Sequence, residues 1–346
     1  MQIDGRKLKI LQAIIHNYII NAEPIGSRTI SKRYDLGVSP ATIRNEMSDL
    51  EELGFLLQPH TSAGRIPSNK AYRLYVDKLT ENQNLTKEKL NNLDKKMLDQ
   101  IGRIEELIEN SASILSKLTN YTSLAIAPQL KLSKIKHIQL VPVDDSRVLL
   151  VIVTDSGIVK NTILRLEKAI SNDQLNIISN LLTTKLKGQM IGGLGKILEK
   201  DVTHNMHEYK DTLNSLITTI NDSFNNIDDI ESYSNGITKI FNFPEYNDIE
   251  KAKSFISFIQ NKDNIIDMLI NSDLKDDHNL GISIGEENTY DEIKNCSLIT
   301  ATYKVNGKVI GKIGVIGPTR MEYSKVIPVV QRLSLDLSNI LKRYFE

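Results

Sequence analysis

The spacing of hydrophobic residues at the start of the chain predicts helices. A first helix is expected from about Asp4 to Asn21, because its apolar positions are three or four residues apart and share one face: Leu8, Leu11, Ile15 and Tyr18. A short second helix is expected from Arg28 to Tyr34, with Ser27 as its N-cap. The segment Asp35–Val38 contains a glycine and reads as the turn into the next helix.

That next helix, Ser39–Gly54, has well-marked ends. Ser39 suits the N-cap position, Pro40 suits the first helical position, and Gly54 suits the left-handed residue that often closes a helix. Its apolar residues form one buried stripe: Ile43, Met47, Leu50 and Leu53.

The opposite face of this helix has an unusual composition near its N-terminus. It carries short or hydrogen-bonding side chains with a single charge among them: Ser39, Ala41, Thr42, Arg44, Asn45 and Ser48. A solvated helix face usually mixes Lys and Glu, whereas a face that fits a DNA major groove has this composition. We therefore predict that Ser39–Gly54 is a recognition helix.

A hairpin is expected directly after the recognition helix. Phe55–Leu57 and Arg65–Pro67 read as two short strands, with Pro59–Gly64 at the tip. Three helices followed by such a hairpin are typical of a winged helix-turn-helix. The second helix and the wing supply the remaining candidate DNA contacts: Ser27, Arg28, Lys32, His60, Thr61, Ser62, Gly64 and Arg65. A three-helix module that binds another protein is the alternative interpretation.

Residues 81–131 are expected to connect the DNA-binding domain to the rest of the chain. A long amphipathic helix runs from about Leu90 to Leu118, and packing against its own domain is favoured over a coiled coil because no heptad is sustained. Ser123–Ala127 then reads as a buried strand.

Residues 132–230 contain three apolar or alternating strands, Lys136–Val143, Arg147–Thr154 and Val159–Leu166. Their short connections predict an antiparallel meander, followed by helices near residues 172–187, 193–199 and 208–221. A small sheet with one helical layer leaves an open face. That face could form a dimer surface or be buried by the neighbouring domain.

Residues 231–346 predict an α+β domain. Strands are expected at Gly236–Phe243, Gly281–Gly285, Cys296–Val305 and Lys308–Gly317, helices near residues 248–260 and 263–269, and a closing helix at residues 319–344. Asn306-Gly307 is a strong hairpin signal. Residues 280–287 could line a ligand pocket, although a strand leaving the core is the favoured interpretation.

Charge is uneven along the chain although its formal net value is zero. Residues 1–80 contain 11 Lys and Arg against 8 Asp and Glu, so the basic excess coincides with the predicted DNA-binding domain. A single cysteine, Cys296, excludes a disulfide framework and favours a reducing cytoplasm. No apolar run approaches a membrane span, and no signal peptide is apparent.

Signals for catalysis are weak. His204 and His207 are read as surface residues rather than metal ligands, Cys296 as a core thiol, and Gly188–Gly195 as a connection between helices rather than a phosphate loop. We expect no enzyme, no metal and no cofactor.

Four motifs closely resemble the bacterial heat-inducible transcription repressor family HrcA. They occur in the family's order: residues 23–30 (EPIGSRTI), 39–47 (SPATIRNEM), 59–67 (PHTSAGRIP) and 317–321 (GPTRM). Ser68, Asn69 and Ala71 depart from the family's pattern just after the wing, which affects only the exit of the wing. The resemblance spans essentially the whole chain.

The resemblance implies a multidomain α+β architecture. Its parts would be a winged helix-turn-helix at residues 1–80, a GAF-like domain split between residues 81–131 and 231–346, and an inserted dimerisation domain at 132–230. It also implies a homodimeric repressor of chaperone operons such as groE and dnaK. This repressor would bind the inverted repeat known as CIRCE and would be assisted by a GroEL-type chaperonin. The rival hypothesis is a winged-helix regulator controlled by a small molecule in the GAF-like domain.

Overall fold

The fold is taken from a computed structural model of the chain. The structure describes residues 3–60, 63–81, 104–126, 134–155, 159–166, 169–189, 231–272, 279–305 and 307–345. Contacts divide the chain into two compact units. One contains residues 1–125, 232–302 and 312–335, and the other contains residues 126–231, 303–311 and 336–346. Each unit is described by itself.

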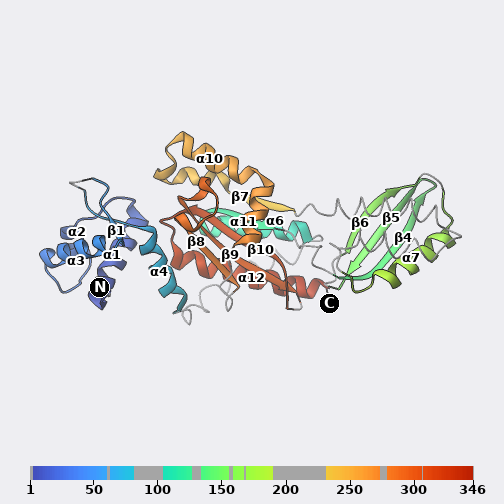
Figure 1. The fold of residues 1–346 in the computed structure, drawn as a ribbon, viewed down its shortest axis with the longest axis horizontal. Coiled ribbons are helices and arrows are strands. Elements are labelled where there is room, and N and C mark those ends of the chain that lie inside the picture. Colours follow the sequence, from blue (N-terminus) through green and yellow to red (C-terminus); the bar gives the residue numbers. More distant parts are fainter. Residues whose placement is uncertain are drawn as a thin grey trace. The chain divides into compact units, whose positions relative to one another are not determined.

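The N-terminal part of the first unit, coloured blue in Figure 1, has the predicted order of elements. Helices α1 (Gly5–Asn21), α2 (Ser27–Arg33) and α3 (Pro40–Glu52) precede strands β1 (Leu56–Leu57) and β2 (Ile66–Pro67), and helix α4 (Asn69–Glu81) follows. The two strands pair antiparallel. The apolar stripes predicted from the sequence meet in a core that includes fully buried residues from all three helices: Ile10, Ile14, Ile30, Ile43 and Leu50.

The cap of α2 differs from the prediction. Gly26, in an extended conformation, is the N-cap, and Ser27 is already the first helical residue. Ile25 forms a bridge to Arg65, which keeps the chain extended up to Gly26, and the helix starts at Ser27, one residue earlier than a serine cap at this position would give.

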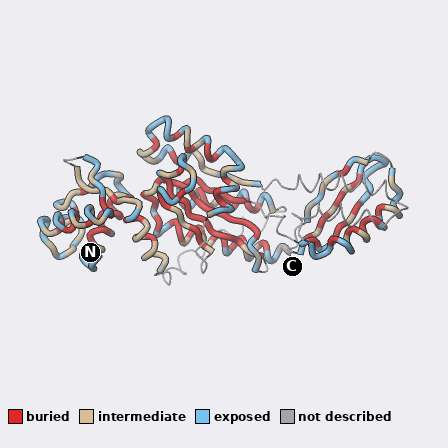
Figure 2. Tube along the Cα trace, viewed as in Figure 1, coloured by how far each residue is buried: buried red, intermediate tan, exposed pale blue. Residues whose placement is uncertain are grey.

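A five-stranded sheet, most of whose residues belong to the first unit, has the strand order β7-β3-β10-β9-β8. Its strands are β7 (Ser232–Asn235), β3 (Thr122–Ile126), β10 (Lys308–Pro318), β9 (Cys296–Val305) and β8 (Leu280–Ile284). Helices α6 (Ile104–Thr119), α10 (Ile249–Gln260), α11 (Lys262–Asn271) and α12 (Tyr323–Phe345) accompany the sheet. Figure 2 shows the central strands as an almost continuous buried region. Mixed helix and sheet in this arrangement is an α+β architecture.

The strand predicted at Gly236–Phe243 is wrong. Strand β7 ends at Asn235, and 3-10 helices η4 (Ile237–Asn242) and η5 (Pro244–Tyr246) follow. Gly236 has φ = 70°, a left-handed conformation that turns the chain out of the strand. The apolar residues Ile237, Ile240 and Phe243 repeat every three residues, which is the period of a 3-10 helix.

The final helix, α12, begins at Tyr323, four residues later than predicted. Thr319 and Arg320 lie in the preceding bend, where Thr319 N donates to the carbonyl oxygen of Asn295 and Arg320 donates to that of Ile19. Two further 3-10 turns, η6 (Gly285–Glu287) and η7 (Asp291–Ile293), connect β8 to β9.

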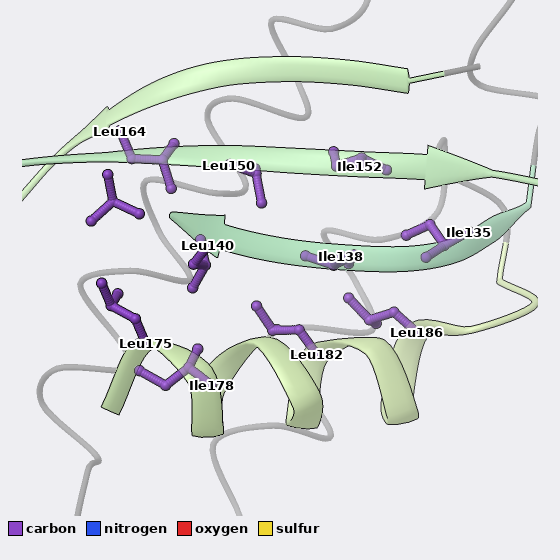
Figure 3. Close-up of a cluster of buried hydrophobic side chains, with 11 residues drawn as sticks. Ile135, Ile138, Leu140, Leu150, Ile152, Leu164, Leu175, Ile178, Leu182 and Leu186 are labelled. Atoms are coloured by element: carbon purple, nitrogen blue, oxygen red, sulfur yellow. The ribbon is translucent and has the colours of Figure 1, made fainter. Parts of the chain in front are cut away.

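The second unit contains the predicted antiparallel meander. Strands β4 (Ile135–Asp144), β5 (Arg147–Thr154) and β6 (Val159–Arg165) pair in that order, and helix α7 (Asn172–Leu186) packs on the sheet. Figure 3 shows the side chains of α7 directed at those of the strands, in a cluster of eleven buried hydrophobic residues. Two hydroxyls of α7 also accept hydrogen bonds from the backbone of β4. Ser179 Oγ accepts one from Leu140 N at 2.9 Å, and Thr183 Oγ1 accepts one from Ile138 N at 3.0 Å.

Several predicted features lie outside the described residues. These are the start of the long helix at residues 90–103, the helices near residues 193–199 and 208–221, most of Gly188–Gly195, and the pair His204 and His207. Among the helices that the structure describes, none is long and apolar enough to cross a membrane.

Candidate nucleic-acid interface

Helix α3, the predicted recognition helix, begins with the predicted serine cap. Ser39 Oγ accepts a hydrogen bond from Thr42 N at 3.1 Å and lies 3.0 Å from Thr42 Oγ1. Pro40 follows as the first helical residue. The cap satisfies one backbone N–H at the helix start and fixes where α3 begins. Ser39 and Thr42 therefore stabilise the start of α3 itself.

The two faces of α3 are sharply different. Ile43 and Leu50 are fully buried and Met47 is 5% exposed, whereas Ala41, Arg44, Asn45 and Ser48 are exposed. The four exposed side chains lie within about two turns that begin at the N-terminus of α3. Arg44 and Asn45 therefore stand next to each other on solvent, in the part of the helix that would reach base edges in a groove.

A buried lysine couples α3 to α1. Lys7 Nζ lies 2.7 Å from Glu46 Oε2 and 3.0 Å from Asp49 Oδ2, and Lys7 itself is only 7% exposed. The hydrogen bonds to Glu46 and then Asp49 raise the pKa of Lys7 above its ordinary value, so the ammonium stays charged. Sequence reasoning missed this contact. Lys7 does lie four residues before Leu11 on the apolar stripe, which is an unusual position for a charge.

The predicted wing, the hairpin of β1 and β2, is held by contacts within the N-terminal part of the chain. Arg65 forms a bifurcated ion pair with Glu51 of α3, with Nε and Nη2 at 2.8 and 2.7 Å from the same carboxylate oxygen. Its backbone also pairs with Ile25, because Ile25 N donates to Arg65 O and Arg65 N donates to Ile25 O. The wing is thus attached both to α3 and to the segment before α2.

The backbone packed against Gly64 leaves no room for a side chain at this position. A Cβ atom at this position would lie 2.4 Å from the carbonyl carbon of Ile25, which is too close for any side chain. The sequence-based hypothesis assigned Gly64 to close approach of DNA; the structure gives it a partner within the protein.

The other candidate contacts are distributed around α3. Arg28 and Lys32 of α2 and His60 of the wing are exposed, whereas Ser27 is half-buried. Among the described residues, no carboxylate forms an ion pair with Arg28, Lys32 or Arg44, so these charges face solvent. Thr61 and Ser62 lie outside the described residues.

A pocket in the first unit overlaps the segment that the sequence suggested for a ligand. It has a volume of about 170 Å³ and is lined in part by Ser283, Glu287 and Asn288. Pockets that hold metabolite-sized ligands usually have roughly 300–1,000 Å³. This pocket would fit only a molecule of a few heavy atoms.

Cys296 lies in the core, as predicted. Cys296 is fully buried and its Sγ lies 2.9 Å from the hydroxyl oxygen of Tyr246, and burial raises the pKa of the thiol to about 12. In the part of the chain that the structure describes, no group of three His, Cys, Asp or Glu side chains could hold a metal ion.

Comparison with known proteins gives consistent matches. The model of the HrcA protein C-terminal domain matches residues 105–327. The heat-inducible transcription repressor HrcA of Alkaliphilus metalliredigens (strain QYMF) is 45% identical and covers 99% of both chains. That of Clostridioides difficile (strain 630) is 44% identical, over 97% of this chain and 98% of the relative.

A solved structure shares the fold. A crystal structure of a hypothetical protein at 2.2 Å resolution superposes with a TM-score of 0.62 and 21% identity, over 99% of both chains. The overall path of the chain is therefore one that has been observed experimentally.

Proposed function

Because the chain belongs to the HrcA family of heat-inducible transcription repressors, we propose that it represses transcription by binding an inverted-repeat operator as a homodimer. The observation that carries this proposal is the two-faced helix α3, capped by Ser39 and held by Lys7, with an exposed Arg44-Asn45 pair. In this proposal residues 1–80 are a winged helix-turn-helix, and each copy of α3 enters the major groove of one half-site.

Arg44 and Asn45 would read bases. Arginine binds the O6 and N7 atoms of guanine with two parallel hydrogen bonds, and asparagine binds N6 and N7 of adenine in the same way. Ala41 and Ser48 lie on the same exposed side of α3 and would contact a thymine methyl group or a phosphate. Ser39 and Thr42, already engaged in the cap, would present the helix N-terminus to a phosphate.

The backbone contacts would come from α2 and the wing. Arg28 and Lys32 are exposed cations on α2, and His60 is exposed on the wing. Ser27, Thr61, Ser62, Gly64 and Arg65 complete the proposed surface. The guanidinium of Arg65 would contact a phosphate. Its ion pair with Glu51 would stabilise the wing at the same time.

The three-stranded sheet of the second unit is the proposed dimer surface. The face opposite α7 carries exposed apolar side chains, with Val141 at 40%, Val159 at 57% and Ile163 at 54% exposure. In the register of the sheet, Leu149 lies between Val141 and Ile163, so three apolar residues line up across the strands. We place the inserted dimerisation domain at residues 132–230, between the two parts of a GAF-like domain at 81–131 and 231–346.

Family membership also suggests the operator and a partner. We propose the CIRCE inverted repeat upstream of chaperone operons such as groE and dnaK as the target, and a GroEL-type chaperonin as the protein that promotes the DNA-binding form. Occupation of the chaperonin by unfolded protein would then release repression. The site would lie in the cytoplasm, where this DNA is found.

The test uses single-base operator variants and two substitutions of Arg44. Arg44→Ala should cost about 1–3 kcal/mol at one operator position and remove the base preference there. Arg44→Lys retains the charge but cannot form the two parallel hydrogen bonds, so it should lose the same preference while keeping the salt dependence of binding. A uniform loss on all operator variants would show that Arg44 contacts a phosphate instead.

A further inference from the structure

A buried arginine connects the DNA-binding elements to the five-stranded sheet. We call α1–α4 with β1 and β2 the head, and the five-stranded sheet with its helices and 3-10 turns the body; the contacts described next lie within the first unit. Arg320, 8% exposed, donates from Nη1 to the carbonyl oxygen of Ile19 at 2.8 Å. Its Nη2 donates to Glu245 Oε2 at 3.2 Å, and its Nε also binds that carboxylate.

The Ile19 carbonyl is well suited to this contact. It lies in the last turn of α1, where carbonyl groups lack helical partners and where a positive charge is favourable. The guanidinium also lies 5.5 Å from the centre of the Phe243 ring, and Phe243 stacks on Tyr121. Arg320 is therefore fixed by the body and reaches the head through one directed hydrogen bond.

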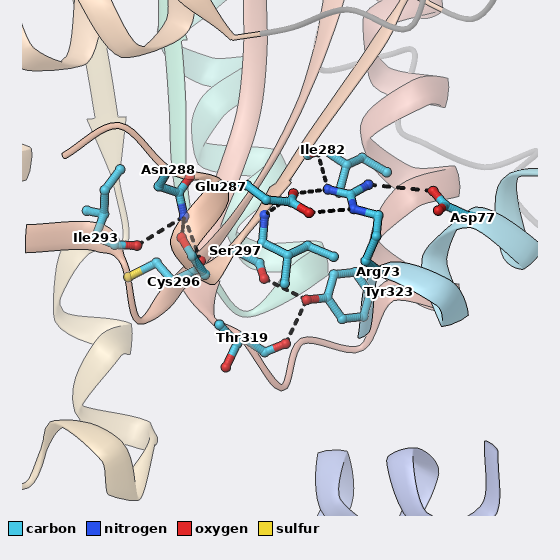
Figure 4. Close-up of polar contacts among 12 residues, drawn as sticks. Arg73, Asp77, Ile282, Glu287, Asn288, Ile293, Cys296, Ser297, Thr319 and Tyr323 are labelled. Carbon is cyan, nitrogen blue, oxygen red and sulfur yellow. Dashed lines mark hydrogen bonds and ion pairs between the residues drawn. The ribbon is translucent and has the colours of Figure 1, made fainter. Parts of the chain in front are cut away.

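A second arginine makes a similar connection from the head. Arg73 on α4 donates from Nε to Glu287 Oε1 at 2.8 Å and from Nη2 to the carbonyl oxygen of Ile282 at 2.7 Å (Figure 4). Glu287 is held in place because its carboxylate also accepts from Ile284 N at 2.9 Å. The neighbouring Asn288 side chain donates to three carbonyl groups, including that of Gly285, and so braces the turn that carries Glu287.

Close packing accompanies these polar contacts. Gly285 of the body has φ = 59°, and a Cβ atom there would lie 2.1 Å from the side chain of Asn69, the first residue of α4. The rings of Tyr72 and Tyr75 on α4 lie 5.9 and 6.5 Å from the ring of Tyr323. Tyr323 in turn shares a hydrogen bond of 2.6 Å with Ser297 of β9.

We propose that Arg73 and Arg320 are positioning residues for operator binding, which hold the head in one orientation on the body. The proposal rests on the proposed binding of a dimer to two half-sites. A head with a fixed orientation allows the second half-site to be bound without a further ordering cost, so two half-sites are bound far more tightly than one. A loosened head would retain its affinity for one half-site and lose the advantage of two.

The experiment compares two duplexes, one with both half-sites and one with a single half-site, by fluorescence anisotropy with the full chain. Arg73→Gln and Glu287→Gln should each weaken binding to the two-site duplex roughly tenfold and change single-site binding less than about twofold. Arg73→Lys, which keeps one ion pair, should give an intermediate loss. Gly285→Ala should reproduce the pattern of Arg73→Gln, because it separates Asn69 from the turn by a different route.

Controls separate positioning from folding. Lys253→Gln breaks the exposed ion pair between Lys253 and Glu250, 3.1 Å apart on α10, and should leave both affinities unchanged. Arg320→Lys is the matched change at the buried site, and thermal unfolding reports whether each variant folds. The Arg73 and Glu287 variants remain informative if the Arg320 variant does not fold, because the Arg73 and Glu287 side chains are 22% and 41% exposed.

The same binding measurements can overturn the inference. Equal losses on both duplexes would mean that these residues act within the head, and unchanged two-site binding would mean that the contacts do not set its orientation. A wild-type chain that binds both duplexes equally would contradict the proposed dimeric function as well. A preference for the two-site duplex in the wild type that persists in the variants contradicts only the positioning role.

Discussion

Ser39 offers a test in which the stability of α3 and its role in DNA binding give separate results. Ser39→Ala removes the acceptor for Thr42 N, now at 3.1 Å, and the contact with Thr42 Oγ1 at 3.0 Å. Loss of such a cap costs about 1 kcal/mol, within a range of roughly 0.5–2 kcal/mol. Because 1.36 kcal/mol corresponds to a factor of ten, opening of the α3 N-terminus should become about fivefold more frequent.

Hydrogen exchange of the α3 amides, measured by mass spectrometry on the full chain, reports this opening directly. Ser39→Asn and Ser39→Asp both restore a cap acceptor and should return exchange to the wild-type rate. Only Ser39→Asp adds a negative charge where we place a phosphate, so it should weaken operator binding roughly tenfold or more compared with Ser39→Asn. Unchanged exchange in Ser39→Ala would refute the capping argument, and equal operator binding by the Asn and Asp variants would refute the orientation of α3.

The remaining predictions concern the second unit and Cys296. Ile163→Asp should convert the proposed dimer to a monomer in analytical ultracentrifugation, whereas Ile177→Asp, on the exposed side of α7 at 44% exposure, should not; a dimer in both would contradict the proposed sheet surface. Leu150→Ala should lower the free energy of unfolding by about 2–5 kcal/mol in urea, because Leu150 is fully buried against α7. Cys296 should react with a thiol reagent at pH 8 only after unfolding. Its pKa of about 12, against an ordinary value of 9.0, means that the unfolded chain ionises first and stability falls above pH 9. Rapid reaction of the native protein would contradict this burial.

The head could be predicted from the sequence because its signals are local. Ser39, Pro40 and the stripe from Ile43 to Leu50 specify the ends and the buried face of α3 within fifteen residues, and the structure confirms them. The antiparallel meander could be predicted equally well, because apolar and polar residues alternate along its strands and the connections between the strands are short. Periodicity and capping act over one or two turns, so no distant residue is needed to detect them.

The features that the sequence did not reveal depend on distant partners. Arg320 contacts the Ile19 carbonyl 301 residues away, and no local pattern relates the two. Gly236 was assigned to a strand because its neighbours are apolar, although its φ of 70° starts a 3-10 helix. Arg65 and Gly64 are predicted DNA contacts because of their place in the hairpin after α3, and the structure shows that they contact Glu51 and Ile25 within the chain.

The distance between the two copies of α3 on operator DNA tests the central claim most directly. Glu52, exposed at the end of α3, can be changed to cysteine and spin-labelled while the buried Cys296 remains unlabelled. Pulsed electron paramagnetic resonance on the operator complex should give one narrow distance, matching two recognition helices in major grooves about 34 Å, or a multiple of that spacing, apart. No dipolar coupling, or a broad distribution that operator DNA does not narrow, would contradict a symmetric dimer that reads an inverted repeat.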